Sequence, residues 1–343
     1  MIKKVKDLIV VIFSISCIGC SSSEKIFFDK ECDVSVETIM ETYVGIPLEM
    51  EKRDDLLFVS DFRGDSLLWM FDLNTGNVKR SLPLGEGPKN FLPPIQYFFS
   101  DSTFVVHNRW HFNLRYCKID SANWKIISVD ESYKLSTDID MIYPLTNDCW
   151  VASGRFPDCR FLIMDRTGKI VSRCGDYPSF MDGESSIPNF PKFMYHQSMF
   201  GFQKASSRLV SVTGHVIELW DYSENKLVLN QRQLLSPYAY SYQEGDFWAS
   251  ANASKNVEKG AERIYCTDKY IYIQYNPNTN EDIYKKKDFF KSEILIFNWN
   301  GQPVTKLNVN KQIICFCVDE DNLRIYCMFN NPDPSIGVLN YSI

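Results

Sequence analysis

A strand–turn–strand unit recurs along this chain and restricts its possible folds more than any other feature. Each copy has an apolar residue, then Asp or Asn, then a short turn with glycine, then a β-branched residue. The copies are Phe71–Val78, Met164–Val171 and Phe297–Val304. Glycine supplies the positive φ that a tight hairpin turn needs, and the flanking apolar runs suit strands. A hairpin that returns about every 45 to 62 residues predicts separate blades around an axis.

Six strand-rich blocks follow one another along the sequence. Their second strands are predicted to begin near Leu56, Thr103, Cys149, Arg208, Tyr270 and Arg324. The last block lacks an outer strand, whereas a surplus extended segment, Cys32–Met40, precedes the first block. Pairing that segment with the last block would close the ring and cover an exposed edge. We therefore predict an all-β fold for residues 26–343: a six-bladed β-propeller of four-stranded antiparallel blades, closed by an N-terminal strand. A two-domain β-sandwich is the alternative.

The N-terminus has the features of an export signal. Three lysines lie within the first six residues and precede a short apolar core, Leu8–Ile15. This core is shorter than the about 20 apolar residues that a membrane-spanning helix needs. Small residues then lead to Cys20, with Gly19 before it and serines after it, as in a bacterial lipoprotein processing site. Cys17 is a weaker alternative site, and an ordinary cleaved signal peptide is a second alternative.

We accordingly expect residues 1–20 to be a lipoprotein signal peptide and residues 21–25 to be a serine-rich tether. Acyl chains on Cys20 would hold the protein at a membrane of the bacterial cell envelope, most simply the outer membrane. The sequence does not tell which side of that membrane the protein occupies.

Charge and cysteine content exclude some classes of function. The net charge is −6 and no basic stripe occurs, so we expect no nucleic-acid partner. Nine cysteines remain after Cys17 and Cys20. Most lie in apolar strand-like runs, which predicts mainly core thiols and leaves room for one disulfide. No pair has the spacing of a zinc site, and we expect neither a metal nor another cofactor.

The run Leu84–Leu92 reads LGEGPKNFL and follows the outer strand of the first block. In this run, and in the leader before it, the chain resembles the TolB-like six-bladed β-propeller lipoproteins of Bacteroidota. The resemblance implies a propeller, a membrane anchor and an envelope location, and it brings no established catalytic residues. The residues alone indicate that Gly85–Pro88 is a chain reversal between blades. It is not a phosphate-binding loop, because neither Lys-Ser/Thr nor a helix follows it.

The loops from the second to the third strand of each blade share one face with the connections between blades. The long connections Gly175–Gln197, Gln233–Glu262 and Asn276–Phe290 fall on that face. Long connections in a compact domain are often binding loops or lids, with disordered insertions as the alternative. All four histidines map to the same face. We predict a ligand-binding ring there, formed by Arg63, Asp65, His107, Arg109, Trp110, His111, Arg155, Asp158, His196, His215, Asn331 and Asp333.

Such a ring would suit a glycan, a peptide or a partner protein. Trp110 offers a stacking surface, and the guanidinium group of Arg109 or Arg155 would bind a carboxylate through two hydrogen bonds. A zinc site from His107, His111 and His215 is a weaker alternative, because the second and fourth blades are not neighbours.

A lipid-anchored binding or scaffold protein is the function that the sequence favours. Neither a Gly-x-Ser-x-Gly nor a His-Glu-x-x-His motif occurs, and the paired carboxylates lie in turns. The alternative is an envelope hydrolase or lyase that acts on a glycan with His, Asp or Arg groups at the channel mouth. A histidine base would need a pKa near the working pH.

Overall fold

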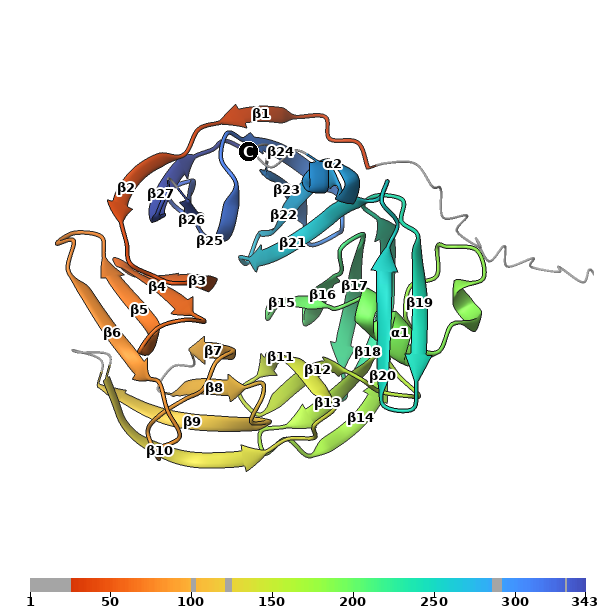
Figure 1. The fold of residues 1–343 in the computed structure, drawn as a ribbon, viewed down its shortest axis with the longest axis horizontal. Helices are drawn as coiled ribbons and strands as arrows, with labels where there is room; N and C mark the ends of the chain where they lie inside the picture. The colour runs from red at the N-terminus through yellow and green to blue at the C-terminus, as the bar shows by residue number, and fades with distance from the viewer. Residues whose placement is uncertain (1–25, 100–102, 121–124, 286–291, 331) are drawn as a thin grey trace, which may run out of the picture.

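Six β-sheets stand around a central axis and form one closed ring (Figure 1). A computed structural model of the chain describes residues 26–99, 103–120, 125–285, 292–330 and 332–343. The predicted signal peptide, tether and lipidation site at Cys20 lie outside the described residues. The ring confirms the propeller and rules out two separate β-sandwiches.

Each blade is a four-stranded antiparallel meander whose first strand lies nearest the axis. The first three blades are β3 (Pro47–Arg53), β4 (Leu56–Asp61), β5 (Ser66–Asp72) and β6 (Val78–Pro83); β7 (Ile95–Phe99), β8 (Phe104–Asn108), β9 (Asn113–Asp120) and β10 (Lys125–Lys134); and β11 (Ile139–Thr146), β12 (Cys149–Gly154), β13 (Phe161–Asp165) and β14 (Ile170–Cys174).

The fourth blade is β15 (Met199–Gln203), β16 (Arg208–Val212), β17 (Val216–Ser223) and β18 (Lys226–Leu234). The fifth and sixth are β21 (Glu258–Cys266), β22 (Tyr270–Thr279), β23 (Ser292–Asn298) and β24 (Pro303–Val309); and β25 (Ile313–Asp319), β26 (Arg324–Asn330) and β27 (Pro334–Asn340). The second strands thus begin within one residue of the predicted positions.

The N-terminal segment closes the ring as predicted, but it serves two blades. β2 (Glu37–Glu41) pairs antiparallel with β27 and supplies the missing outer strand of the sixth blade. β1 (Glu31–Val34) pairs parallel with β24 and adds a fifth strand to the fifth blade. The chain therefore covers two sheet edges that would otherwise be open to pairing with other molecules.

The recurring turns have the geometry that their sequence predicts. Gly76, Gly168 and Gly301 adopt φ of 70°, 85° and 73°. In the turn after β5, the carboxylate of Asp72 accepts the N–H groups of Asn74 and Thr75, at 2.9 and 3.0 Å. In these three turns a short polar side chain before the glycine, that of Asp72, Asp165 or Asn298, accepts main-chain N–H groups and holds the turn.

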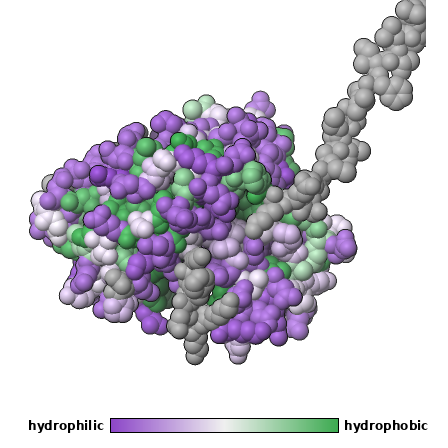
Figure 2. Space-filling view, turned by 90° about the horizontal axis from the view of Figure 1, so that it is seen from above, coloured by the Kyte–Doolittle hydropathy of each residue, from purple (hydrophilic) through white to green (hydrophobic). Residues whose placement is uncertain are grey.

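Apolar side chains fill the spaces between neighbouring blades, and the outer strands face water. Figure 2 shows this rim, where hydrophilic side chains predominate and apolar ones are scattered between them. The GEGP reversal lies at the surface, with Glu86 and Pro88 exposed, and Phe91 behind it is packed into the core: Phe91 is 1% exposed, and the Arg115 guanidinium lies 4.4 Å from its ring centroid. The nine cysteines of the described residues are free thiols, and six of them are buried.

The long connections contain secondary structure of their own. They hold η1 (Glu184–Ser186), α1 (Asn189–Tyr195), the hairpin β19 (Tyr240–Gly245) and β20 (Trp248–Ala253), and α2 (Asn280–Lys285). α1 and the hairpin lie beside the fourth blade (Figure 1). Their shared apolar cluster includes Ile187, Tyr238 and Val257. Two of the three predicted binding loops therefore form a packed addition to the propeller.

Candidate functional site

The centre of the ring contains a cavity of about 730 Å³. Residues of all six inner strands line it: β3, β7, β11, β15, β21 and β25. Its size is within the about 300–1,000 Å³ of typical small-molecule sites. The lining includes Thr103, Asn147 and Lys204, which belong to turns between first and second strands. The cavity therefore extends towards the face opposite the long connections.

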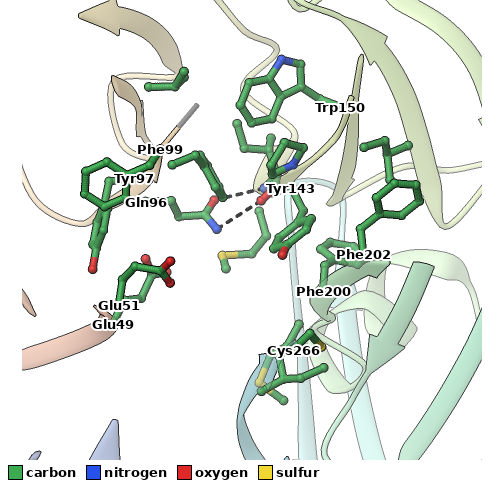
Figure 3. A pocket seen from close by; sticks show the side chains of 18 of the residues that line it. Glu49, Glu51, Gln96, Tyr97, Phe99, Tyr143, Trp150, Phe200, Phe202 and Cys266 are labelled. Carbon is green, nitrogen blue, oxygen red and sulfur yellow. Dashed lines mark hydrogen bonds between the residues drawn. The ribbon is translucent and has the colours of Figure 1, made fainter. Parts of the chain in front are cut away.

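β3 supplies the charged wall of the cavity. Glu49, Glu51 and Arg53 alternate along this strand with Met50, which packs into the core between the first and sixth blades. Because successive side chains of a strand point to opposite sides, the three charged groups lie on one side. Figure 3 shows the carboxylates of Glu49 and Glu51 side by side, next to the open space.

Burial in the cavity makes both glutamates weaker acids than a glutamate in water. It raises the pKa of Glu49 from 4.5 to about 7, against the opposing effect of Arg263 and Arg109. It raises the pKa of Glu51 to about 7 as well, against Arg53 and a hydrogen bond from Tyr265. Neither carboxylate forms an ion pair within 4.0 Å with a described residue. Both groups thus exchange protons close to neutral pH.

Four arginines line the cavity, and each contacts groups of the protein itself; Arg166 pairs with Glu131 at 2.9 Å. Arg109 forms an ion pair with Asp140. The Nε and Nη1 groups of Arg263 donate to the carbonyl oxygens of Leu48 and Glu262, at 3.2 and 2.7 Å. Arg53 lies over the ring of Phe99 with its guanidinium carbon 4.2 Å from the centroid. These contacts hold the guanidinium groups in fixed positions around the carboxylates.

The opposite wall of the cavity is mainly aromatic. Tyr143 of β11 and Phe200 and Phe202 of β15 lie there, with Cys266 beside them (Figure 3). Burial raises the pKa of Tyr143 and of Cys266, so both stay neutral. The two glutamates of β3 therefore face side chains that carry no charge at neutral pH.

The side chain of Gln96 links strand β7 to strand β11, which supplies Tyr143 of the aromatic wall. Its side-chain oxygen accepts the N–H of Ile142 at 3.0 Å, and its amide donates to the carbonyl of the same residue at 3.3 Å. Figure 3 shows both bonds. They tie β7 to β11 across the boundary between the second and third blades, so the walls of the cavity form a rigid frame.

Among the members of the predicted ring that the structure describes, Arg109 is the one that lines this cavity. Asp65 and Asp158 instead pair with Arg80 and Arg173 of their own blades' outer strands, at 3.3 and 2.7 Å. Both pairs are exposed and turn away from the axis. Arg155 pairs with Asp138 at 3.3 Å. These side chains share the predicted face but do not converge on the channel.

Four further residues of the predicted ring are exposed on loops of that face: Arg63, Trp110, His111 and Asp333. Trp110 is 64% exposed, and its ring meets that of Phe62 edge-on at 5.9 Å. Asn331 lies outside the described residues. These loops stand above the middle of the blades, whereas the inner strands line the channel.

His107, in contrast, is buried between blades. Its Nδ1 lies 3.0 Å from the side-chain oxygen of Gln96, and burial lowers its pKa to about 3. The imidazole is therefore neutral at physiological pH and helps to orient Gln96, the residue that ties β7 to β11.

His196 lies in the packed addition beside the fourth blade, and His215 lies against that addition in the turn between β16 and β17. Nε2 of His196 is 2.7 Å from Glu184, which also accepts the hydroxyls of Tyr238 and Tyr240 at 2.7 and 3.0 Å. Nδ1 of His215 lies 3.0 Å from the hydroxyl of Ser236. Burial lowers the pKa of both histidines, that of His215 to about 4.

Glu184 is ionised at the centre of this cluster. Burial alone would raise its pKa, but hydrogen bonds from His196 and Tyr238 lower it to about 2. The predicted ring thus separates into exposed loop residues and buried structural histidines.

The zinc alternative finds no support in the geometry. His107 lies in the second blade and His215 in the fourth. In the part of the chain that the structure describes, no three His, Cys, Asp or Glu side chains are grouped so as to hold a metal ion. Nor does any helix among those residues have the length and apolar character needed to cross a membrane.

The sequence did not predict the acidic wall of the channel, because its patterns located second strands, outer strands and loops but no first strands. A signal was present: four of the five residues Glu49–Arg53 are charged, directly before the buried strand Leu56–Asp61. Glu49, Glu51 and Arg53 share one side of this strand and line the cavity, whereas Lys52 lies on the other side and pairs with Asp319 at 3.0 Å.

The fold and the lined cavity define a six-bladed β-propeller with a central small-molecule-sized site. The family model described as TolB-like 6-blade propeller-like matches residues 27–321. The chain therefore belongs to the TolB-like six-bladed propeller family. No match to a curated protein was found.

Several solved structures share the fold. One is a member of the DUF4221 family from Bacteroides vulgatus, with 14% identity and a TM-score of 0.55 over 90% of this chain and 99% of that one. A protein from Bacteroides fragilis has 11% identity and a TM-score of 0.54 over 90% and 99%. The β-propeller domain of Cps50 (Swd1) from Myceliophteria thermophila has 11% identity and a TM-score of 0.52 over 90% and 100%. At these identities the likeness concerns the fold alone.

Proposed function

We propose that this protein is a lipid-anchored binding protein of the bacterial cell envelope that holds a small ligand in its central channel. The observation that carries the proposal is the cavity of about 730 Å³. Two glutamates and four arginines line it together with aromatic side chains such as Tyr143, Phe200 and Phe202. Apolar walls with a few fixed polar groups are the usual composition of a ligand site. The anchor and the envelope location rest on the export signal and Cys20.

A propeller that served only as a scaffold would have little use for this arrangement. Keeping Glu49 and Glu51 in a site where burial raises the pKa of each to about 7 opposes folding at neutral pH. Stability lost at a specific site is typical of binding and catalytic centres. The channel therefore favours a ligand over a purely structural role.

The hydrolase alternative loses the residues on which it depended. His107 and His215 have pKa values lowered to about 3 and about 4, and both side chains are buried against protein groups. A general base needs access to substrate and a pKa near the working pH. Neither histidine meets these conditions.

The test is a thermal-shift screen with the protein from Ser21 onwards, against panels of glycans, peptides, amines and organic acids. Each hit is repeated with two variants. The channel variant carries Glu49→Gln and Glu51→Gln, and the loop variant carries Arg63→Ala, Trp110→Ala and Arg155→Ala. A ligand that binds the native state raises the melting temperature. We expect hits to disappear in the channel variant and to persist in the loop variant. Hits with the opposite pattern would place the site on the loop face.

A further inference from the structure

The channel offers a ligand two carboxylates and an aromatic surface. The guanidinium groups of Arg109 and Arg263 already donate to Asp140 and to main-chain carbonyls, and Arg53 lies on the ring of Phe99. The carboxylates of Glu49 and Glu51 have no such ion-pair partner among the described residues. Both carboxylates therefore remain available for an ion pair with a ligand.

Two other roles for these carboxylates do not fit their position in the structure. They do not lie in a solvated turn, because burial dominates the pKa of each. They do not form a metal site with a third ligand, since no group of three suitable side chains occurs among the described residues. What they face is the open part of the cavity (Figure 3).

We propose that the channel ligand is an organic cation, an ammonium- or guanidinium-bearing small molecule. Its charged nitrogen lies against Glu49 and Glu51, and its remainder lies against Tyr143, Phe200 and Phe202. This inference rests on the proposed function and specifies the ligand class of the same site. A cation is attracted by the negative faces of aromatic rings as well as by carboxylates. It thereby gives the two carboxylates a direct ion-pair partner and leaves the arginine contacts in place.

Binding of a permanent cation must then depend on pH. The groups that face Glu49 are Arg263 of β21, Arg109 of the β8–β9 loop, Glu51 and the main chain of Tyr97. Those that face Glu51 are Arg53 and Tyr265. The arginines keep their charge over the accessible range. Protonation of the two glutamates is therefore the change that weakens cation binding as the pH falls through about 7.

The experiment is isothermal titration calorimetry with choline, putrescine and agmatine as cations. The neutral isostere of choline, 3,3-dimethylbutan-1-ol, and succinate serve as neutral and anionic probes. Choline has no titrating group, so its pH dependence belongs to the protein. We expect at least one cation to bind at about pH 8 at least tenfold more tightly than the neutral and anionic probes. Its affinity should fall at least tenfold at about pH 5.

The variants Glu49→Gln and Glu51→Gln should each weaken that binding about tenfold or more. Glu37→Gln is the matched control, because Glu37 is exposed on the outer strand β2, and it should bind as the native chain does. Failure of every cation to bind the folded protein, or equal binding of the neutral isostere, overturns the inference. If instead a glycan or an anion gives a thermal shift that depends on the channel residues, the proposed function stands and the cation assignment falls. If hits depend on the loop residues only, both fall.

Discussion

Replacing Glu49 by Gln should stabilise this protein at neutral and alkaline pH but not at acidic pH. Burial raises the pKa of Glu49 from 4.5 to about 7, so the folded state binds the proton more tightly than the unfolded state does. Ionisation of Glu49 therefore opposes folding. This penalty is absent below about pH 4.5, grows as the pH rises and is complete above about pH 7.

The size of the effect follows from the shift. A change from 4.5 to about 7 corresponds to at most about 3 kcal/mol. Glu49 is only partly buried, and water in the cavity screens its charge. We therefore expect Glu49→Gln to raise the free energy of unfolding by about 2 kcal/mol at about pH 8 and to leave it unchanged at about pH 4.

Urea denaturation followed by circular dichroism measures this difference, provided that the m-value is the same for both proteins. The control Glu37→Gln removes one exposed carboxylate of an outer strand and should change the free energy of unfolding little at either pH. A variant that is equally or less stable than the native chain at about pH 8 would refute the reasoning. So would a gain of the same size at both pH values.

Three further predictions concern the frame around the channel. Glu184→Gln should lower the free energy of unfolding by about 3 kcal/mol at neutral pH, because the buried carboxylate accepts hydrogen bonds from His196, Tyr238 and Tyr240; a loss below about 1 kcal/mol in urea denaturation would contradict this. Phe91→Ala should cost about 3–5 kcal/mol in the same assay, since the ring is 1% exposed in the core between the first two blades, and a loss typical of a surface residue would contradict its buried position. Removing residues 26–41 should expose the edge strand β27 and cause self-association in light scattering, whereas a stable monomer would show that β2 is not needed for closure.

The fold could be predicted because its signals are local. The turns before the outer strands of the first, third and fifth blades have a positive φ, and Gly76 supplies it in the first. Apolar runs such as Leu56–Asp61 mark second strands that are buried on both faces. The surplus strand at one end and the missing strand at the other could be matched by counting. The sequence did not reveal that the N-terminal segment divides between two blades, since β1 pairs in parallel with a strand about 270 residues away.

The site was harder to predict because it depends on radial position. Arg109 and Trp110 are adjacent in sequence and lie on the same face, yet Arg109 lines the channel while Trp110 is exposed to solvent. Loop residues can be assigned to a face from the order of the strands. Their distance from the axis depends on how each loop packs. His196 illustrates this point: it ends α1, inside a long connection that the sequence showed only as an insertion.

The most direct test of the account is a crystal structure of the protein with the compound that gives the largest thermal shift. The account predicts electron density for the ligand in the central channel, in contact with Glu49 and Glu51 on one side and with Phe200 and Phe202 on the other. Density on the loop-rich face near Trp110 and Arg155, with an empty channel, would contradict it.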